Sequence, residues 1–229
     1  MISDRSLNQQ QTIFDSWLSI LQREKAIAVI RSPRFDIGLA MAEAVAQGGM
    51  RAIEITCNSD RHQALIGELR VRLPHCFIGA GTVLERTQLE EAIACGAQFI
   101  FSPHFDPNLL EIAVHRHQIP YVPGVLTPTE IVTAYSTGAS ALKVFPISAM
   151  GGASYIKSLQ APLGNIPLIP TGGVTIDNAT EMIAAGAIAV GLSGGLFPTS
   201  LVKAGHWQKI SDRAKLLLES LDKGVASSE

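Results

Sequence analysis

The sequence predicts an α/β fold, a closed (β/α)8 TIM barrel with an extra N-terminal helix, on three observations. Short apolar segments alternate with amphipathic stretches, which is the pattern of βαβ units and a parallel sheet. Eight such segments can be counted, the number that closes a barrel. Glycines that end predicted helices also recur along the chain at similar intervals. We therefore expect one barrel domain over residues 1–229.

The eight predicted strands are short and apolar, and helix-forming stretches separate them. The first twenty-odd residues predict an extra helix that closes the bottom of the barrel, and residues 208–223 predict the last outer helix. The strands are predicted at Ala26–Ile30, 51–56, 76–82, 99–102, 121–123, 141–145, 167–170 and 187–192.

Four glycines mark the period of the barrel. Gly48, Gly96, Gly138 and Gly186 each follow a predicted helix and precede a predicted strand. Glycine at such a position permits the left-handed conformation that ends many helices. Neighbouring glycines of this set lie 48, 42 and 48 residues apart, and each interval holds two βα units. Four double units make the eight that a barrel needs.

An open doubly wound sheet is the alternative fold for alternating strands and helices. Its dinucleotide-binding form carries a glycine-rich fingerprint directly after the first strand. This chain has Ile30-Arg31-Ser32-Pro33 at that point instead. The barrel is therefore the favoured prediction.

Composition narrows the functional classes. The 229-residue chain has a formal net charge of −2, so no basic surplus indicates a nucleic-acid partner or an anionic membrane. No apolar run reaches the length of a membrane span, and no secretory signal is apparent. Three cysteines without a CxxC pair fit a reducing compartment. We expect a cytoplasmic protein that acts on a small molecule.

Polar side chains and glycines gather where the predicted strands end. The active site of a (β/α)8 barrel lies at this end of the strands, so these residues are the candidates for chemistry and binding. The candidate site residues are Arg31, Glu54, Asn58, Thr82, Pro103, Lys143, Phe145, Thr171, Gly172, Gly173, Ser193 and Gly194.

Lys143 is the strongest single candidate. Leu142 and Val144 flank it, so strand alternation turns these two toward the helices and Lys143 into the barrel. Lysine is almost never fully buried without a partner, and burial disfavours its charged form. A neutral amine can attack a ketone and form a Schiff base. A structural lysine paired with a carboxylate is the alternative, and strand position alone favours neither.

Glu54 follows the same pattern in the second predicted strand. Ile53 and Ile55 flank it, which turns the carboxylate inward. A carboxylate near an inward lysine can move protons during carbinolamine formation, dehydration and carbon–carbon cleavage. A buried ion pair between Glu54 and Lys143 without chemistry is the alternative, because buried charges are usually paired.

Two glycine turns, at residues 171–173 and 193–195, follow the seventh and eighth predicted strands. Glycine lets backbone N–H groups approach an anion closely, and a following helix N-terminus adds a favourable dipole. Barrel phosphate sites often use this pair of loops, so phosphate is favoured over ordinary tight turns. No cluster of His, Asp and Glu suggests a metal site, and we expect neither a metal nor another cofactor.

Five short motifs carry a family resemblance. They are Glu54-Ile55-Thr56, Gly79-Ala80-Gly81-Thr82-Val83-Leu84, Ser102-Pro103, Leu142-Lys143-Val144-Phe145-Pro146 and Thr171-Gly172-Gly173-Val174. In order and spacing, across roughly residues 20–215, the chain resembles the 2-keto-3-deoxy-6-phosphogluconate (KDPG) and 4-hydroxy-2-oxoglutarate (KHG) aldolase family. These class I aldolases are (β/α)8 barrels, usually trimeric. They cleave KDPG to pyruvate and glyceraldehyde 3-phosphate, and some cleave KHG to pyruvate and glyoxylate.

The resemblance implies a role for each motif. Lys143 would form the Schiff base, and Glu54 would act as general acid and base. Thr82 would help to hold the pyruvyl carboxylate, while Pro103 and Phe145 would line the pocket. The glycines after the seventh and eighth strands would cradle the phosphate. The resemblance also implies a 2-keto acid or sugar-acid phosphate substrate, no cofactor beyond the lysine itself, and a homotrimer.

Two positions depart from the common family pattern. Many members have arginine at the position of Asn58, where it can clamp a carboxylate bidentately, whereas asparagine has no charge. The Asn58-Ser59 pair is more similar to the related 2-dehydro-3-deoxy-6-phosphogalactonate (KDPGal) aldolases, as is Arg31, which would replace the missing charge. Members also often have serine at the position of Gly194, whereas the serine of this chain is Ser193.

Several functional hypotheses follow. Cleavage of KDPG, with KHG as a second substrate, is preferred, and cleavage of KDPGal, which differs in the configuration of one hydroxyl, is the alternative. A phosphosugar isomerase or epimerase would keep the phosphate loops and use Glu54 as a base without imine chemistry. A non-catalytic keto-acid-binding barrel would fit the absence of arginine at position 58, but not the retention of Lys143 and Glu54.

Overall fold

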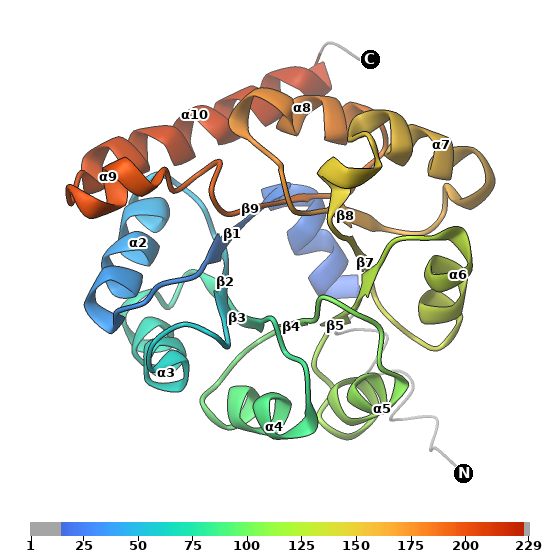
Figure 1. The fold of residues 1–229 in the computed structure, drawn as a ribbon, viewed down its shortest axis with the longest axis horizontal. Helices are drawn as coiled ribbons and strands as arrows, with labels where there is room; N and C mark the ends of the chain where they lie inside the picture. Colours follow the sequence, from blue (N-terminus) through green and yellow to red (C-terminus); the bar gives the residue numbers. More distant parts are fainter. Residues whose placement is uncertain (1–14, 227–229) are drawn as a thin grey trace.

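The computed structural model describes residues 15–226, which form a closed barrel of parallel strands surrounded by helices (Figure 1). The strands are β1 (Ala26–Ile30), β2 (Ala52–Thr56), β3 (Phe77–Gly81), β4 (Ile100–Phe101), β5 (Tyr121–Val122), β6 (Gly124–Val125), β7 (Leu142–Val144), β8 (Leu168–Pro170) and β9 (Val190–Leu192). One sheet has the order β5-β4-β3-β2-β1-β9 and the other has the order β6-β7-β8. A parallel bridge between Thr171 and Gly191 joins the β8 side to β9. The predicted (β/α)8 barrel is confirmed.

Helices cover the outside of the barrel and follow the strands in turn (Figure 1). The helical elements are α2 (Phe35–Gln47), α3 (His62–Arg72), α4 (Arg86–Ala94), α5 (Pro107–Leu110) with its π-helical continuation η1 (Glu111–Arg116), α6 (Pro128–Ser136), the 3-10 turn η2 (Ile147–Met150), α7 (Ala153–Leu163), α8 (Ile176–Ala184), α9 (Thr199–Lys203) and α10 (Trp207–Ala226). Within residues 15–226, no helix combines the length and the hydropathy that a membrane span requires.

The fifth strand position is divided in two by a proline. It was predicted at residues 121–123, but β6 continues it to Val125, so that prediction was too short. Pro123 has no backbone N–H and therefore interrupts the ladder between β5 and β6. Its carbonyl still accepts a 2.9 Å hydrogen bond from the backbone N–H of Lys143. β5 and β6 together supply one of the eight strand positions.

Three of the four periodic glycines have the predicted left-handed conformation, with φ of 94° at Gly96, 111° at Gly138 and 103° at Gly186. The prediction for Gly48 was wrong, because its φ is −72° and the left-handed residue is Gly49. Gly48 continues the helical hydrogen bonding of α2. A Cβ atom at Gly48 would overlap the backbone of α10, so close helix packing requires glycine there.

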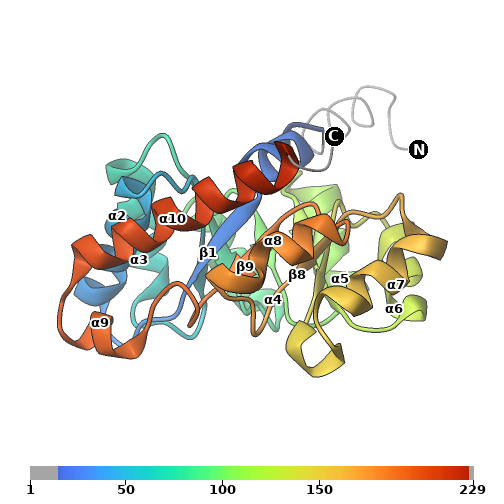
Figure 2. The ribbon, with the colours of Figure 1, turned by 90° about the horizontal axis from the view of Figure 1, so that it is seen from above.

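The helix at residues 15–24 closes one end of the barrel, as predicted. The part of the predicted helix before residue 15 lies outside the described residues. Trp17, Ile20 and Leu21 are buried in a cluster with inward-facing strand residues, and the Trp17 ring stacks on Phe99 with centroids 4.7 Å apart. Figure 2 shows this helix beside the end of α10, where Lys25 is 3.4 Å from Asp222. The floor of the barrel is therefore apolar and aromatic.

Trp17→Ala is expected to lower the free energy of unfolding by about 3–5 kcal/mol, since it removes a large buried ring from this floor. Urea denaturation followed by circular dichroism would measure the change. Val71→Ala is the matched control, because Val71 is 78% exposed and such substitutions shift stability by about 0.5 kcal/mol or less. Equal midpoints for wild type and Trp17→Ala would contradict a stabilising role for the helix.

Side-chain alternation along the strands divides the core into two layers. Ile53, Ile55, Leu142 and Val144 pack in the outer cluster between strands and helices. Ala141 belongs to the inner cluster with the floor aromatics. Because Lys143 and Glu54 alternate with the outer residues, both point into the barrel.

Candidate active site

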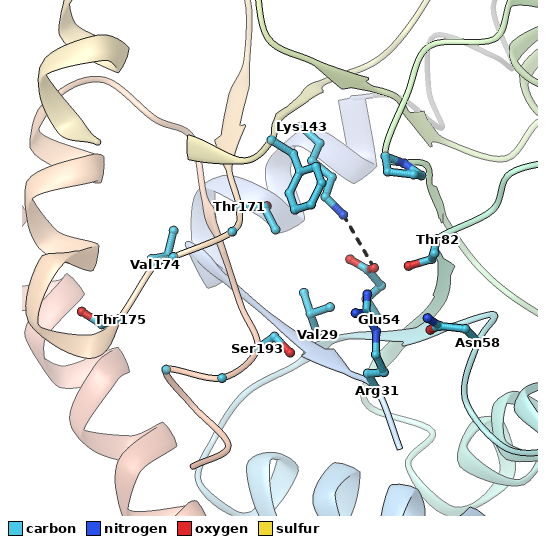
Figure 3. A pocket seen from close by; sticks show the side chains of 16 residues that line it. Val29, Arg31, Glu54, Asn58, Thr82, Lys143, Thr171, Val174, Thr175 and Ser193 are labelled. Carbon is cyan, nitrogen blue, oxygen red and sulfur yellow. Dashed lines mark ion pairs between the residues drawn. The ribbon is translucent and has the colours of Figure 1, made fainter. Parts of the chain in front are cut away.

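A cavity of about 540 Å³ opens where the barrel strands end (Figure 3). The twelve residues that the sequence predicted for the site all line this cavity. In Figure 3, Glu54, Asn58 and Thr82 lie on one side of it and Thr171, Thr175 and Ser193 on the other. The predicted residues in the wall are Arg31, Glu54, Asn58, Thr82, Pro103, Lys143, Phe145, Thr171, Gly172, Gly173, Ser193 and Gly194.

Lys143 and Glu54 face each other deep in this cavity. Lys143 is 5% exposed and Glu54 is 1% exposed, so both charged groups are nearly removed from solvent. The Nζ atom of Lys143 lies 3.9 Å from Oε1 of Glu54 (Figure 3). In the described part of the chain, Oε1 has no hydrogen-bond partner. A buried carboxylate oxygen without a partner is available to a substrate or a water molecule placed beside the amine.

Burial raises the pKa of the Glu54 carboxyl, and the charges of Lys143 and Arg31 oppose this rise. In Figure 3 the nitrogen atoms of Arg31 point toward Glu54. A carboxyl with a raised pKa can hold and release a proton closer to neutral pH, which suits general acid and base catalysis.

Two glycines in β3 make room for the buried side chains of neighbouring strands. A Cβ atom at Gly81 would overlap the Glu54 carboxylate, and one at Gly79 would overlap the Phe99 ring. Glu54 pairs with Gly79 across β2 and β3 and Thr56 pairs with Gly81, so the Glu54 side chain extends along the sheet to reach Gly81. Gly81 therefore sets the position that the Glu54 carboxylate can take.

Thr82 follows directly and has an unusual backbone. Its φ is +56°, in the left-handed region that β-branched residues rarely adopt. Conformations of this kind cost free energy and concentrate at functional sites. Figure 3 shows the Thr82 side chain on the Glu54 side of the cavity.

Aromatic rings surround the amine of Lys143. The Nζ atom lies 5.2 Å from the ring centroid of Phe145 and 5.7 Å from that of Phe101. Gly172, with φ +85°, allows a close approach to Phe145, because a Cβ atom there would lie 2.9 Å from the ring. The neighbours of the amine are thus two apolar rings and the Glu54 carboxylate.

The loop after β8 leads directly into the N-terminus of α8. Gly173 has φ +89° and precedes the N-cap residue Thr175, which forms a capping box with Asn178. Asn178 also donates a 3.2 Å hydrogen bond to the Gly173 carbonyl. This loop therefore has a fixed shape at a helix N-terminus, a position that favours anions.

Four further residues line the cavity that were not among the twelve candidates, although Gly195 lies in the predicted 193–195 turn. Val29 faces inward because it alternates with the outward-facing Ala28 and Ile30, a pattern that is readable in the sequence. Thr175 starts the motif Thr175-x-x-Asn178, whose N-cap signal is readable in the sequence. The four residues are Val29, Val174, Thr175 and Gly195.

Other candidate groups are less suited to chemistry. Burial raises the pKa of the Cys57 thiol to about 12, so this thiol stays protonated and is a poor nucleophile. Among residues 15–226, no group of three or more His, Cys, Asp and Glu residues is arranged to hold a metal ion.

A family model described as KDPG and KHG aldolase matches residues 18–213. The chain belongs to this aldolase family. The KHG/KDPG aldolase of Escherichia coli strain K12 is 30% identical over 201 residues, which cover 88% of this chain and 94% of the relative. The sequence resemblance stated above is thereby confirmed.

Two solved structures of similar proteins have the same fold. A native KDPGal structure is 33% identical with a TM-score of 0.79, covering 88% of this chain and 96% of the other. KDPG aldolase from Legionella pneumophila, captured with pyruvate as a covalent carbinolamine intermediate, is 27% identical with a TM-score of 0.81. The latter match covers 87% of this chain and 97% of the Legionella chain.

Proposed function

We propose that this chain is a class I aldolase that cleaves KDPG to pyruvate and glyceraldehyde 3-phosphate through a Schiff base on Lys143. KHG, which yields pyruvate and glyoxylate, is proposed as a second substrate. The observation that carries the proposal is the buried Lys143 amine, 3.9 Å from the buried Glu54 carboxylate in a cavity bounded by two glycine loops. The covalent pyruvate intermediate of the Legionella relative supports it.

The chemistry requires one amine and one proton-transfer group. The Lys143 amine attacks the C2 carbonyl carbon, and loss of water from the carbinolamine gives an iminium ion. Glu54 accepts the proton of the C4 hydroxyl, the C3–C4 bond breaks, and its electron pair enters the iminium system to form an enamine. The aldehyde leaves, C3 is protonated, and water releases pyruvate and the free amine. No metal or separate cofactor takes part in these steps.

Substrate anions are assigned to two regions of the cavity. Thr82 and Arg31 would hold the carboxylate of the keto acid, and Arg31 would supply the charge that Asn58 lacks. Arg31 and Asn58 line the same cavity, and in Figure 3 the Arg31 side chain reaches toward Glu54, which supports a role for Arg31 in place of an arginine at position 58. Phosphate would bind the backbone N–H groups of the loops after β8 and β9, beside the N-terminus of α8.

KDPGal cleavage is the second candidate. Asn58, Arg31 and the 33% identical KDPGal structure favour it. Pyruvate release from KDPG, KDPGal and KHG, coupled to lactate dehydrogenase, separates the two. We expect kcat/KM for KDPG to exceed that for KDPGal by about tenfold or more, a difference of about 1.4 kcal/mol in transition-state stabilisation. A higher kcat/KM for KDPGal than for KDPG would show that KDPGal is the preferred substrate. Absence of pyruvate release from all three compounds would contradict the proposal.

Glu54→Gln is expected to lower kcat by about 10²- to 10⁴-fold and to remove the acidic limb of the pH profile. Because burial raises the Glu54 pKa, the basic carboxylate is lost as pH falls through a value above the usual glutamate range, and activity falls with it. Measuring kcat against pH for both proteins checks this. Glu68→Gln, on the surface of α3, should keep the wild-type limb. If Glu54→Gln kept the acidic limb of the pH profile, that limb would have to come from the titration of another group.

Assembly and location stay predictions. A homotrimer would give three chain masses by light scattering, and a single chain mass would contradict it. The cytoplasmic location likewise rests on the composition of the sequence.

A further inference from the structure

A second cavity, of about 370 Å³, adjoins the candidate active site. Arg31, Ser193 and Gly194 line both cavities, so the two share part of one wall. The second cavity lies between Ile37 of α2 and Val202 of α9 and is called the side chamber here. Figure 1 shows α2 and α9 side by side at the same edge of the barrel. This shared wall makes the chamber a continuation of the active site.

Gly194 lies at the junction of the two cavities and has no packing reason to be glycine. A Cβ atom there would meet no other atom within 4 Å. A Cβ atom at the neighbouring Gly195 would lie 2.5 Å from the Val174 carbonyl oxygen, so close packing excludes a side chain at that position only. The missing side chain at Gly194 therefore leaves unfilled space on the wall that the two cavities share.

The walls of the side chamber combine apolar side chains with two cations, Arg31 on the shared wall and Lys203 on α9. Ile37, Met41, Phe197 and Val202 supply hydrocarbon and aromatic surface. Met41 and Phe197 are 4% and 6% exposed, so they form a fixed part of the core. Lys203 lines the same chamber, and among residues 15–226 no Asp or Glu residue does. A carbon chain that ends in an anion matches this lining.

We propose that the side chamber binds the distal part of extended aldehydes, namely aldehydes with an apolar carbon chain and a terminal carboxylate. The aldehyde carbon would lie beside Lys143, the chain would pass Gly194, and the carboxylate would pair with Lys203. The inference rests on the proposed aldolase function and adds a substrate class to it. Hydroxylated, phosphorylated chains would instead use the loops after β8 and β9.

The reaction can be run toward synthesis to test this class. The enamine formed from pyruvate and Lys143 attacks the aldehyde carbon through C3, and a new carbon–carbon bond forms. The aldehyde oxygen takes a proton, and water then hydrolyses the iminium ion. The products are a 4-hydroxy-2-keto acid with a longer chain and the free lysine amine, so no further reactant is needed.

The test compares pyruvate addition to glyoxylate, hexanal and 6-oxohexanoate. For wild type we expect 6-oxohexanoate to have a KM about tenfold below that of hexanal, because the charged pair with Lys203 adds binding. Lys203→Ala should raise the KM for 6-oxohexanoate about tenfold and leave the other two aldehydes within about twofold. Val202→Phe, which fills the chamber, should raise the KM for both six-carbon aldehydes and spare glyoxylate.

The matched controls are Lys209→Ala on α10 and Val132→Phe on α6, which lie outside the chamber and should leave all three aldehydes unchanged. Lys203 is exposed, so its variant keeps the test independent of any folding defect in Val202→Phe. Turnover of glyoxylate without turnover of 6-oxohexanoate would overturn the side chamber alone. Equal effects of the variants on all three aldehydes would also overturn it. Absence of both glyoxylate turnover and a pyruvate adduct would overturn the aldolase function and this inference together.

Discussion

Lys143→Met is expected to reduce KDPG cleavage by at least about 10⁴-fold, the scale seen when an enzyme loses its nucleophile. The substitution removes the amine that attacks the keto carbon and keeps a side chain of similar length. Methionine also keeps contact with the rings of Phe101 and Phe145, which lie within 6 Å of the amine. Pyruvate release in a coupled assay measures the loss.

The control is Lys157→Met, which replaces an exposed lysine on α7. It should retain wild-type kcat, because Lys157 lies outside the cavity wall. Circular dichroism should show that both variants are folded. Retention of more than about one-tenth of wild-type kcat by Lys143→Met would contradict nucleophilic catalysis by this residue.

Gly81→Ala should reduce kcat by about 10²-fold or more although residue 81 carries no functional group. The new Cβ atom would overlap the Glu54 carboxylate, which is 1% exposed at the deep end of the cavity. Either the carboxylate or strand β3 must shift, and proton transfer to a substrate on Lys143 would lose its geometry. A folded variant with low kcat and little change in the KM for KDPG is the expected result.

Gly67→Ala in α3 is the matched control for this substitution. A Cβ atom at Gly67 would have its nearest neighbour at 3.8 Å, which is ordinary contact. Alanine in a helix interior should raise stability by about 0.5–1 kcal/mol and leave kcat unchanged. Wild-type kcat in Gly81→Ala would mean that the Glu54 position is not set by β3.

The inward direction of the two charged residues could be predicted from the sequence because strand alternation is local. Leu142 and Val144 on either side of Lys143 were enough to assign its face, and Ile53 and Ile55 did the same for Glu54. Closure of the barrel was also predictable, since the number of βα units can be counted along the chain. These features depend on residue order alone.

Features that depend on three-dimensional contacts were not predictable from the sequence. The 3.9 Å separation of Lys143 and Glu54 follows from the register of strands far apart in the chain. The role of Gly48 was also hidden in the sequence. Glycine is needed at this position because the backbone of α10 packs against it, and not because the chain makes a left-handed turn there. The side chamber also lay beyond sequence reasoning, since α2 and α9 belong to opposite ends of the chain.

Borohydride reduction of the wild-type protein in the presence of pyruvate, followed by intact-protein and peptide mass spectrometry, tests the central claim most directly. We expect one reduced pyruvate adduct per chain, located on Lys143, and none without pyruvate. An adduct confined to another lysine, or no adduct in folded protein, would contradict Schiff-base catalysis. The latter result, together with turnover of a sugar phosphate, would favour an isomerase or epimerase on this barrel.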